Sequence, residues 1–327
     1  MSGVALAPGR SITASLEGMV LAYPDLLQFH RDPDYVAWAV PPTEEKVAVI
    51  SGSGSGHEPL PVGYVGPGML DAACPGRVFT SPSPVQLVAA TRAVAQEAGA
   101  VYVVKNYAGG VMTAEMALDL LGDEAIPVRT VLVNDDVAIP DPARRRGLGA
   151  AVLASKIAGA AAQAGLPLDQ VADLAERMVQ NTRSLGVATD ACTLARAGIR
   201  EPLPPDQVEW GVGIHGEPGQ VRPLPKDPVL LLEEMAEALR ADLELRPGEP
   251  LLLMLSSLGG TPQAELYWAF RHLHRTLQAM GLSIARHLVG TFITCLGRGG
   301  WIATLARMDG QLLELWDAPV HTPVLHW

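Results

Sequence analysis

Residues 46–59 read Lys46-Val47-Ala48-Val49-Ile50-Ser51-Gly52-Ser53-Gly54-Ser55-Gly56-His57-Glu58-Pro59. The apolar start of this stretch predicts a buried strand, and the glycine–serine segment after it predicts a loop. Alternate glycines have no Cβ and let backbone amides approach a small polar ligand closely. The imidazole of His57 at the rim of the loop can move a proton. The stretch therefore predicts a ligand site at the end of a strand.

Strands and helices are expected to alternate around this stretch. The apolar runs 100–104 and 128–133 predict buried strands, whereas residues 85–98 and 147–164 predict helices. The alanine-rich part of the second helix, residues 150–161, predicts tight packing against another element. Such alternation is typical of a mainly parallel sheet with helices on its faces.

A second unit is expected after a break near residues 181–186 and a proline-rich linker at 201–205. The pattern then predicts strands at 208–214, 250–255, 283–289, 301–306 and 312–316, and helices at 228–243 and 262–280. A length of 327 residues favours two domains. We expect two α/β domains, residues 1–185 and 186–327, with mainly parallel or mixed sheets covered by helices and a ligand cleft at the C-terminal ends of the strands.

The composition argues against several classes of protein. The chain has 24 basic and 35 acidic residues, so it repels phosphate backbones and is not expected to bind nucleic acid. Cys74, Cys192 and Cys295 are far apart and form no CxxC pair, which argues against a disulfide framework and a thiolate zinc site. No segment holds about 18 consecutive apolar residues, and the N-terminus has no export signal. We expect a cytoplasmic protein without membrane spans.

A second histidine lies in a similar context, because the string Gly213-Ile214-His215-Gly216-Glu217-Pro218-Gly219 also follows a predicted strand. The carboxyl ends of strands line the ligand crevice of open α/β sheets, so His57 and His215 could face one cleft. In the alternative interpretation, each imidazole only donates to a carbonyl in a tight turn. Neither histidine forms the i, i+4 pair of the zinc helix motif, so no metal is expected.

Two phosphate-binding motifs do not fit the glycine–serine segment. A P-loop needs lysine where His57 follows Gly56. The dinucleotide fingerprint needs Gly-x-Gly-x-x-Gly opening a helix, whereas Pro59 disfavours helical geometry at Glu58. The segment therefore predicts neither a P-loop nor a Rossmann site.

Seven segments are long and unusual in sequence. They are residues 54–59 (Gly-Ser-Gly-His-Glu-Pro), 63–73 (Gly-Tyr-Val-Gly-Pro-Gly-Met-Leu-Asp-Ala-Ala), 78–83 (Val-Phe-Thr-Ser-Pro-Ser), 104–107 (Val-Lys-Asn-Tyr), 133–138 (Val-Asn-Asp-Asp-Val-Ala), 213–219 and 258–262 (Leu-Gly-Gly-Thr-Pro). Together they closely resemble the substrate-binding subunit of the dihydroxyacetone kinases, nearly from end to end.

The resemblance implies a chemistry for both histidines. His215 would attack the ketone carbon of dihydroxyacetone, or of a similar small ketose, and form a hemiaminal. His57 would handle the proton of the hydroxyl group that is phosphorylated. Gly54, Ser55, Gly56 and Lys105 would donate hydrogen bonds to the ligand's oxygen atoms. Attack needs a neutral imidazole, the main form at pH 7 for an ordinary pKa of about 6.5.

One position of the motif departs from the family. After Lys105-Asn106-Tyr107 the family continues with Thr-Gly-Asp, whereas this chain has Ala108-Gly109-Gly110. Gly110 thus stands at a substrate-binding position where the family has an aspartate that works with the first histidine. General acid–base help is worth about 10²- to 10⁴-fold in rate, so its loss predicts a binder with weak kinase activity. Thr113, Ser257 and residues 295–300 also differ from the family pattern.

The resemblance also implies partners. No segment resembles the family's helical nucleotide-binding domain, so we expect this chain to bind no cofactor and a helical partner subunit to carry Mg-ATP or Mg-ADP. A homodimer is expected to cover the apolar tail at 316–327, unless that tail packs on its own domain.

Three functions follow from these expectations. The first is the substrate-binding subunit of a dihydroxyacetone kinase, which transfers phosphate to an alcohol group. The second is a weak or inactive paralogue that senses dihydroxyacetone as a co-regulator. The third is an unrelated enzyme of small carbonyls or phosphate esters on the same scaffold.

Overall fold

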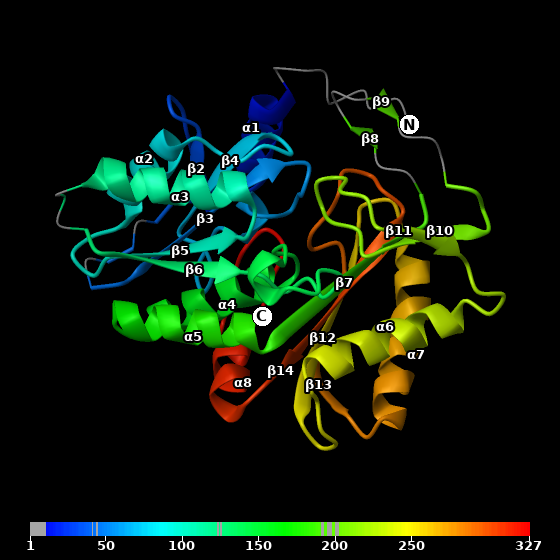
Figure 1. Cartoon of the computed structure of the whole chain (residues 1–327). Helices are drawn as coiled ribbons and strands as arrows, with labels where there is room; N and C mark the ends of the chain where they lie inside the picture. The colour runs from blue at the N-terminus through cyan, green and yellow to red at the C-terminus, as the bar shows by residue number, and fades with distance from the viewer. Residues whose placement is uncertain are drawn as a thin grey trace.

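The computed structural model describes residues 11–327, except residues 41, 44, 123, 125, 191–192, 195–197 and 200–202. In this part of the chain, two six-stranded mixed sheets and their covering helices form successive layers (Figure 1). The expected α/β architecture with mixed sheets is confirmed. No helix in the described ranges is long and apolar enough to cross a bilayer.

The first sheet has the strand order β1-β2-β4-β3-β5-β6. Its strands are β1 (Leu27–His30), β2 (Tyr35–Trp38), β3 (Ala48–Ser55), β4 (Ala72–Val78), β5 (Ala100–Lys105) and β6 (Val128–Val133). Strands β4, β3, β5 and β6 run parallel, whereas β2 is antiparallel to β1 and β4. The carboxyl ends of β3, β5 and β6 therefore lie at one edge. The buried strand predicted at 100–104 is confirmed. A strand at 128–133 is also present, but β6 lies at the edge of the sheet and only Val131 and Val133 are buried, so its prediction as a buried strand is wrong.

The prediction of a loop over the whole glycine–serine segment is wrong, because β3 continues to Ser55. Gly52 and Gly54 pair with β4 through Cys74 and Gly76. A Cβ atom on Gly54 would lie 2.6 Å from the backbone nitrogen of Thr80. The glycines are thus needed for close packing of the chain beside the strand, and only Gly56, with a φ of 97°, begins the turn.

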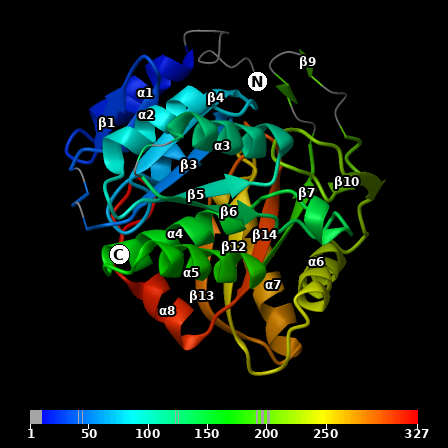
Figure 2. The same cartoon turned by 60° about the vertical axis from the view of Figure 1, so that its left-hand side comes forward.

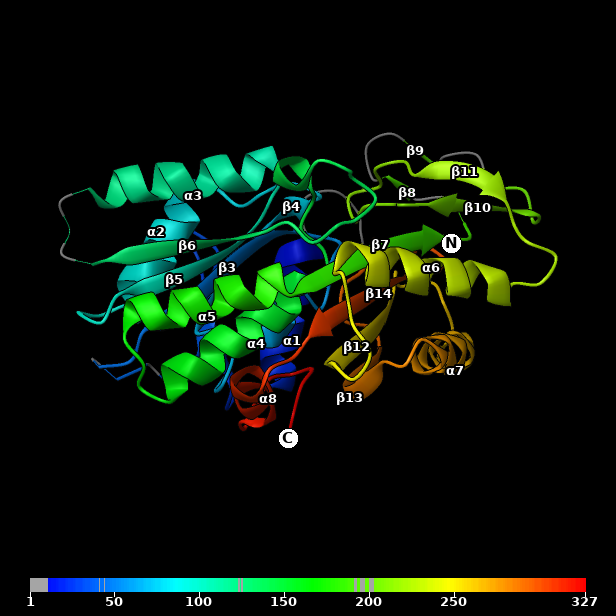
Figure 3. The same ribbon diagram turned by 60° about the horizontal axis from the view of Figure 1, so that its bottom comes forward.

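Helices cover both faces of the first sheet. Helices α2 (Pro84–Val94) and α3 (Ala108–Leu121) pack on the face that carries Ile50 and Tyr102. Helices α4 (Ala150–Gln163) and α5 (Leu168–Gln180) pack on the face that carries Val49 and Val101. Figures 2 and 3 show these two helix pairs on opposite sides of β5 and β6. Helix α1 (Ser11–Ala22) precedes β1.

The second sheet has the strand order β11-β10-β7-β14-β12-β13. Its strands are β7 (Thr182–Ala188), β10 (Gln207–Trp210), β11 (Gln220–Pro223), β12 (Pro250–Ser257), β13 (Ser283–Gly290) and β14 (Gly300–Arg307). Helices α6 (Val229–Asp242) and α7 (Gln263–Ala279) cover one face. Within the described part of this second sheet, β12 and β13 are the only strands that pair in parallel, so the sheet is mainly antiparallel.

Two sequence-based predictions fail in this half. The predicted break at 181–186 is occupied by β7, which pairs with β14 along its whole length. The predicted strand at 312–316 is helix α8 (Gly310–Asp317). The Asp309 side chain caps α8 by accepting a hydrogen bond of 2.8 Å from the Leu312 backbone, and Leu312, Leu315 and Trp316 are buried at helical spacing. A short apolar run fits either period, and here the cap selects the helix.

Other expectations are only partly covered by the structure. Residues 201–202 of the expected linker and Cys192 lie outside the described residues. The short strands β8 (Thr193–Leu194) and β9 (Gly198–Ile199) precede β10. The domain boundary at 185/186 falls within β7 and stays a prediction.

Helix α4 is shared by the two sheets. Every residue from Ala150 to Ala162 is buried, and the same apolar cluster contains Val49 and Val103 of the first sheet with Met254 and Ile302 of the second. A Cβ atom on Gly159 would lie 2.3 Å from the Cα atom of Met69. The predicted tight packing of this alanine-rich helix is therefore confirmed, and large side chains would not fit.

Asp135 fixes the start of this shared helix. Its fully buried carboxylate accepts hydrogen bonds from the backbone nitrogens of Leu148 (2.7 Å) and Ala150 (2.9 Å) and from the Ser184 hydroxyl. Burial raises the pKa of Asp135, and these donors oppose that rise. One carboxylate thus joins the end of β6, the start of α4 and strand β7.

The C-terminal tail packs on its own chain. Trp316, Val320 and Leu325 are buried, and Val320 and Trp327 exchange two backbone hydrogen bonds of 3.1 Å. Only Trp327 of these four is substantially exposed, at 41%. The tail therefore gives no support to a homodimer, which stays a prediction.

We predict that Asp135→Ala lowers the free energy of unfolding by about 3–5 kcal/mol, because it leaves buried donors without their charged acceptor. The matched variant Asp141→Ala removes a carboxylate that caps an exposed turn by accepting from Ala143. This variant should lower the free energy of unfolding by about 1 kcal/mol or less. Urea denaturation of both variants measures the difference. Equal losses would show that Asp135 does not organise the start of α4.

Candidate functional site

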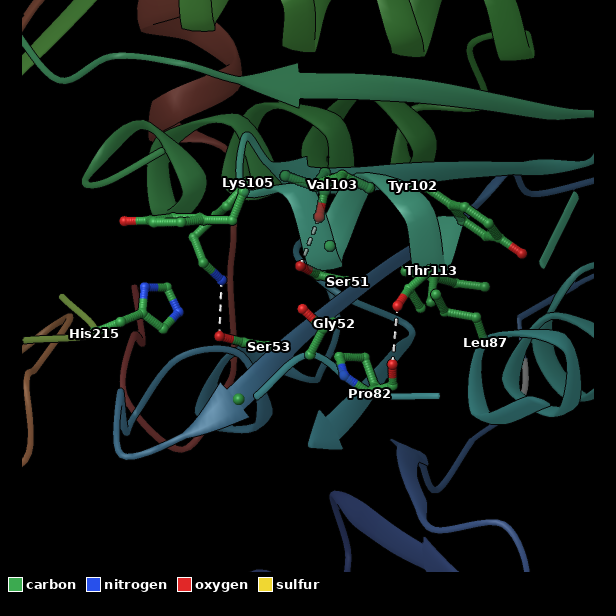
Figure 4. A pocket seen from close by; sticks show the side chains of 16 residues that line it. Ser51, Gly52, Ser53, Pro82, Leu87, Tyr102, Val103, Lys105, Thr113 and His215 are labelled. Atoms are coloured by element: carbon green, nitrogen blue, oxygen red, sulfur yellow. Dashed lines mark hydrogen bonds between the residues drawn. The ribbon is translucent and has the colours of Figure 1, made fainter. Parts of the chain in front are cut away.

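A small pocket lies at the carboxyl ends of β3 and β5, where a ligand cleft was expected (Figure 4). Its cavity volume is about 30 Å³, so the pocket is small. The residues that line it include Ser51, Ser53, Gly54, Lys105, Gly110 and His215. The first sheet supplies all of these except Gly110, from α3, and His215, which follows β10 of the second sheet.

His57 lies beside this pocket in a fully buried position. Its Nδ1 atom is 2.9 Å from the carbonyl oxygen of Thr294, and a carbonyl only accepts, so Nδ1 carries the proton. Its Nε2 atom therefore holds a lone pair, and it has no hydrogen-bond partner among the described residues. Burial, then His215 and Lys105, hold the pKa of His57 well below its ordinary value. The imidazole is thus a neutral base.

His215 is partly exposed and is oriented by Glu217. The carboxylate of Glu217 lies 3.3 Å from the Nδ1 atom of His215 and accepts a hydrogen bond of 2.7 Å from its backbone nitrogen. The pKa of Glu217 is lowered, because the bond and charge of His215 outweigh desolvation by burial. The ionised carboxylate holds the proton on Nδ1 and directs the lone pair of Nε2 away from itself.

The two histidines lie together, as predicted. Their ring centroids are 4.4 Å apart and the rings are nearly perpendicular, at 85°. The Tyr107 ring contacts His215 edge-on at 4.3 Å, and the Phe79 ring stacks on His57 at 5.1 Å. The aromatic rings restrict the orientations that both imidazoles can adopt.

Each histidine is anchored by the opposite half of the molecule. Thr294, which follows β13 of the second sheet, holds His57 and also donates its hydroxyl to the carbonyl oxygen of Glu58 at 2.9 Å. Arg146 contacts Asp136, at the end of β6, at 2.6 Å and donates to the carbonyl oxygen of Gly211, at 2.7 Å, before His215. The two sheets therefore set the distance between the imidazoles jointly.

Lys105 points into the pocket and donates to the Ser53 hydroxyl at 2.8 Å (Figure 4). Its side chain is buried, and its residue exposure is only 7%. Desolvation lowers the pKa of Lys105 to about 7. Neutral amine and ammonium are therefore both populated near neutral pH.

Gly110 lines the same pocket from the first turn of α3. Its φ is not in the left-handed region, and a Cβ atom there would lie 3.3 Å from the carbonyl oxygen of Lys105. A side chain at this position would thus start beside Lys105 and require only a small shift. Thr113 also lines the pocket, whereas Ser257 serves a turn by accepting from Gly259 and Thr261.

Two predicted ligand contacts are already engaged within the protein. The Ser55 hydroxyl donates to the carbonyl oxygen of Gly76 at 2.8 Å. Gly56 donates its backbone nitrogen to the Glu58 carboxylate at 2.8 Å, and its carbonyl oxygen accepts from Leu296. Neither residue lines the pocket, whereas Gly54 does. Their roles as ligand donors stay predictions.

Several contributors to the site escaped the sequence analysis. Glu217 was named only within the string 213–219, and its position two residues after His215 was the available signal for its orienting role. Ser53 and Tyr107 adjoin the predicted residues, whereas Thr294 is 237 residues away from His57 and carries no local signal. In the described residues, no group of three or more metal-binding side chains is arranged to hold an ion.

Comparison with known proteins adds a family to this geometry. A family model described as the Dak1 domain matches residues 17–324. The chain is 38% identical over 340 residues, and 95% of each chain, to the dihydroxyacetone-binding subunit of the PEP-dependent dihydroxyacetone kinase of Escherichia coli (strain K12).

Two solved structures are also similar. One is a dihydroxyacetone kinase operon co-activator, with a TM-score of 0.90, 30% identity and coverage of 95% of this chain and 97% of that one. The other is the dihydroxyacetone kinase from C. freundii in complex with AMP-PNP and Mg²⁺, with a TM-score of 0.86, 32% identity and coverage of 95% and 58%.

We predict that His57 makes stability depend on pH below about 6.5. The unfolded chain binds a proton there near pH 6.5, whereas buried His57 does not, so acid favours the unfolded state. Through this residue, the free energy of unfolding should fall by about 1.4 kcal/mol for each pH unit below that value. His57→Asn retains a donor toward Thr294 and should lack this slope.

Urea denaturation from pH 8 to pH 5 provides the measurement for both proteins. The difference at pH 8, where both side chains are neutral, isolates the change in packing. If the free energy of unfolding changed with pH equally in wild type and variant, the pKa of His57 would not be lowered in the folded protein.

Proposed function

Because the chain belongs to the Dak1 domain family, we propose that it is the dihydroxyacetone-binding subunit of a dihydroxyacetone kinase. One structural observation supports this proposal independently of the family membership. Two histidines with fixed tautomers, His57 and His215, lie with their ring centroids 4.4 Å apart at a small pocket that His215 lines. This pair provides one nucleophile and one base.

His215 would capture the ligand. The lone pair of its Nε2 atom adds to the ketone carbon, and the carbonyl oxygen becomes the hydroxyl of a hemiaminal after taking up a proton. Glu217 stabilises the charge that the imidazole acquires during this attack. Lys105 supplies N–H donors to the ligand's oxygen atoms in either protonation state. Glycerol has no carbonyl group, so this capture would select ketones and aldehydes.

His57 would serve the second step. Its unpaired Nε2 atom can accept the proton of the ligand's hydroxyl as that oxygen is phosphorylated. We propose that a separate helical subunit carries Mg-ATP or Mg-ADP and delivers the phosphoryl group. Two relatives support this division, because the Escherichia coli protein is one subunit of a kinase and the C. freundii kinase forms a complex with AMP-PNP and Mg²⁺.

A co-regulator that senses dihydroxyacetone is the second candidate. Gly110 provides no carboxylate beside Lys105. In addition, the structure of the operon co-activator is similar to this chain, with a TM-score of 0.90. Such a protein would need the capture by His215 but not the proton transfer. The two candidates therefore differ in turnover and not in binding.

We predict that dihydroxyacetone forms a covalent bond with His215. A crystal soaked with the ligand should show continuous density between the ketone carbon and Nε2. His215→Ala should abolish the bond, whereas His321→Ala, at an exposed site in the C-terminal tail, should retain it. Ligand that is bound at saturating concentration without a covalent bond to the imidazole would contradict the capture mechanism.

We predict that Gly110→Asp raises partner-dependent turnover, by up to about 10²-fold, because it restores a carboxylate beside the reacting groups. The matched control is Ala108→Asp, which adds a carboxylate to the same turn of α3 at an exposed residue that does not line the pocket. A coupled kinase assay with the nucleotide-bearing subunit measures both variants. Without the partner, neither should phosphorylate the ligand.

Two outcomes would contradict the kinase interpretation of Gly110. Wild-type turnover at ordinary kinase rates of about 1–100 per second would show that no carboxylate is needed. If wild type and Gly110→Asp both bind the ligand but neither turns over, the co-regulator is the better description.

A further inference from the structure

The chain has four lysines, and their surroundings differ. Lys46 is buried against the carboxylate of Asp71, with 2.6 Å between the charged atoms. Lys156 is buried and donates to the carbonyl oxygen of Leu315 at 2.7 Å, whereas Lys226 is exposed. Lys105 is the lysine that lines the pocket of the candidate site.

The immediate contacts of Lys105 leave its nitrogen reactive. Among the described residues, its hydrogen-bond partner is the Ser53 hydroxyl, and no carboxylate forms an ion pair with it. Gly110, whose Cβ position adjoins the backbone of Lys105, contributes none. Desolvation without a counter-charge lowers the pKa of Lys105 to about 7, so a large fraction is neutral amine at physiological pH. A neutral amine in a pocket for carbonyl compounds is a nucleophile.

We propose that Lys105 is a second carbonyl-capturing residue of this pocket and forms an imine with the small ketone or aldehyde that enters it. This inference rests on the proposed function for the nature of the ligand. The amine lone pair adds to the carbonyl carbon, and a proton moves from nitrogen to oxygen to give a carbinolamine. Loss of water then forms the C=N bond. The carbonyl oxygen and both amine protons leave as that water, and no oxidant or reductant is needed.

The geometry supports both the addition of the amine and the loss of water. Ser53 orients the Lys105 nitrogen within the pocket, and His215 lines the same cavity (Figure 4). The lone pair on Nε2 of His215 can accept the remaining amine proton and pass it to the departing hydroxyl, which leaves the imidazole neutral again. Since one carbonyl carbon bonds to one nucleophile at a time, the imine on Lys105 and the hemiaminal on His215 are alternative states of the bound ligand.

Chemistry distinguishes the two adducts. The nitrogen of His215 that attacks has no hydrogen left to lose, so its hemiaminal cannot become a neutral imine. The carbinolamine on the primary amine of Lys105 can become a neutral imine, because its nitrogen still has a hydrogen to lose. Sodium cyanoborohydride reduces imines faster than ketones and converts an imine on lysine into a stable secondary amine.

The test treats the intact protein with dihydroxyacetone and sodium cyanoborohydride. We expect a mass gain of one ligand minus one oxygen atom, and peptide mapping should assign it to Lys105. Lys105→Arg should abolish the gain, whereas His215→Ala should slow the trapping but leave the adduct on Lys105. The matched control Lys156→Arg alters the other buried lysine without a carboxylate ion pair, which lies away from the pocket, and should also retain the gain.

The pH dependence provides a second readout. The trapped fraction should rise as the pH increases through about 7, the pKa of Lys105. Gly110→Asp should lower the yield at pH 7 at least about tenfold and move the rise to higher pH, because a nearby carboxylate favours the ammonium form. This variant keeps the inference testable if Lys105→Arg fails to fold.

Three results would overturn the inference. They are an adduct that persists in Lys105→Arg, an adduct that maps to Lys226 or the N-terminus, and ligand binding by calorimetry without any reducible adduct. The last result would leave the proposed function intact. Absence of ligand binding in wild type would instead overturn the proposed function together with the inference.

Discussion

Helix α4 packs against both sheets, and this shared packing fixes how the two halves of the molecule meet. A helix buried on all sides needs small side chains, and residues 150–162 meet that need with alanine, glycine and serine at most positions. The carboxylate of Asp135 holds the start of the helix and contacts β7 at the same time. The edge of the first sheet that carries His57 is thereby placed beside the loop of the second that carries His215.

The site uses burial to control charge. His57 and Lys105 both have lowered pKa values, chiefly because burial removes the water that would stabilise their charged forms. Glu217 stays ionised through its contact with His215. The site therefore has a neutral imidazole in His57, a lysine that is partly neutral near pH 7, and an anchored negative charge on Glu217.

Local sequence patterns predicted much of the fold and part of the site. Strands β5 and β6 were predicted from short apolar runs, and helices α6 and α7 from apolar residues at helical spacing. Strand β7 was missed because its glycine and polar residues resemble a break, although its pairing with β14 and β10 makes it central. The meeting of His57 and His215 followed from their positions after strands. The anchors Thr294 and Arg146 did not, because their partners are distant in sequence.

The reciprocal anchoring also limits how a ligand can reach the pocket. Moving the two sheets apart would pull Met254 and Ile302 away from the apolar cluster around α4 and would break the contacts of Thr294 and Arg146 together. Such an opening exposes apolar surface at about 25 cal/mol per Å² and leaves buried polar groups unpaired. Ligand entry need not separate the sheets, because the side chain of His215, which lines the pocket, is 20% exposed. Shared packing around α4 and reciprocal anchoring of the histidines therefore make separation of the sheets the costlier route to the pocket.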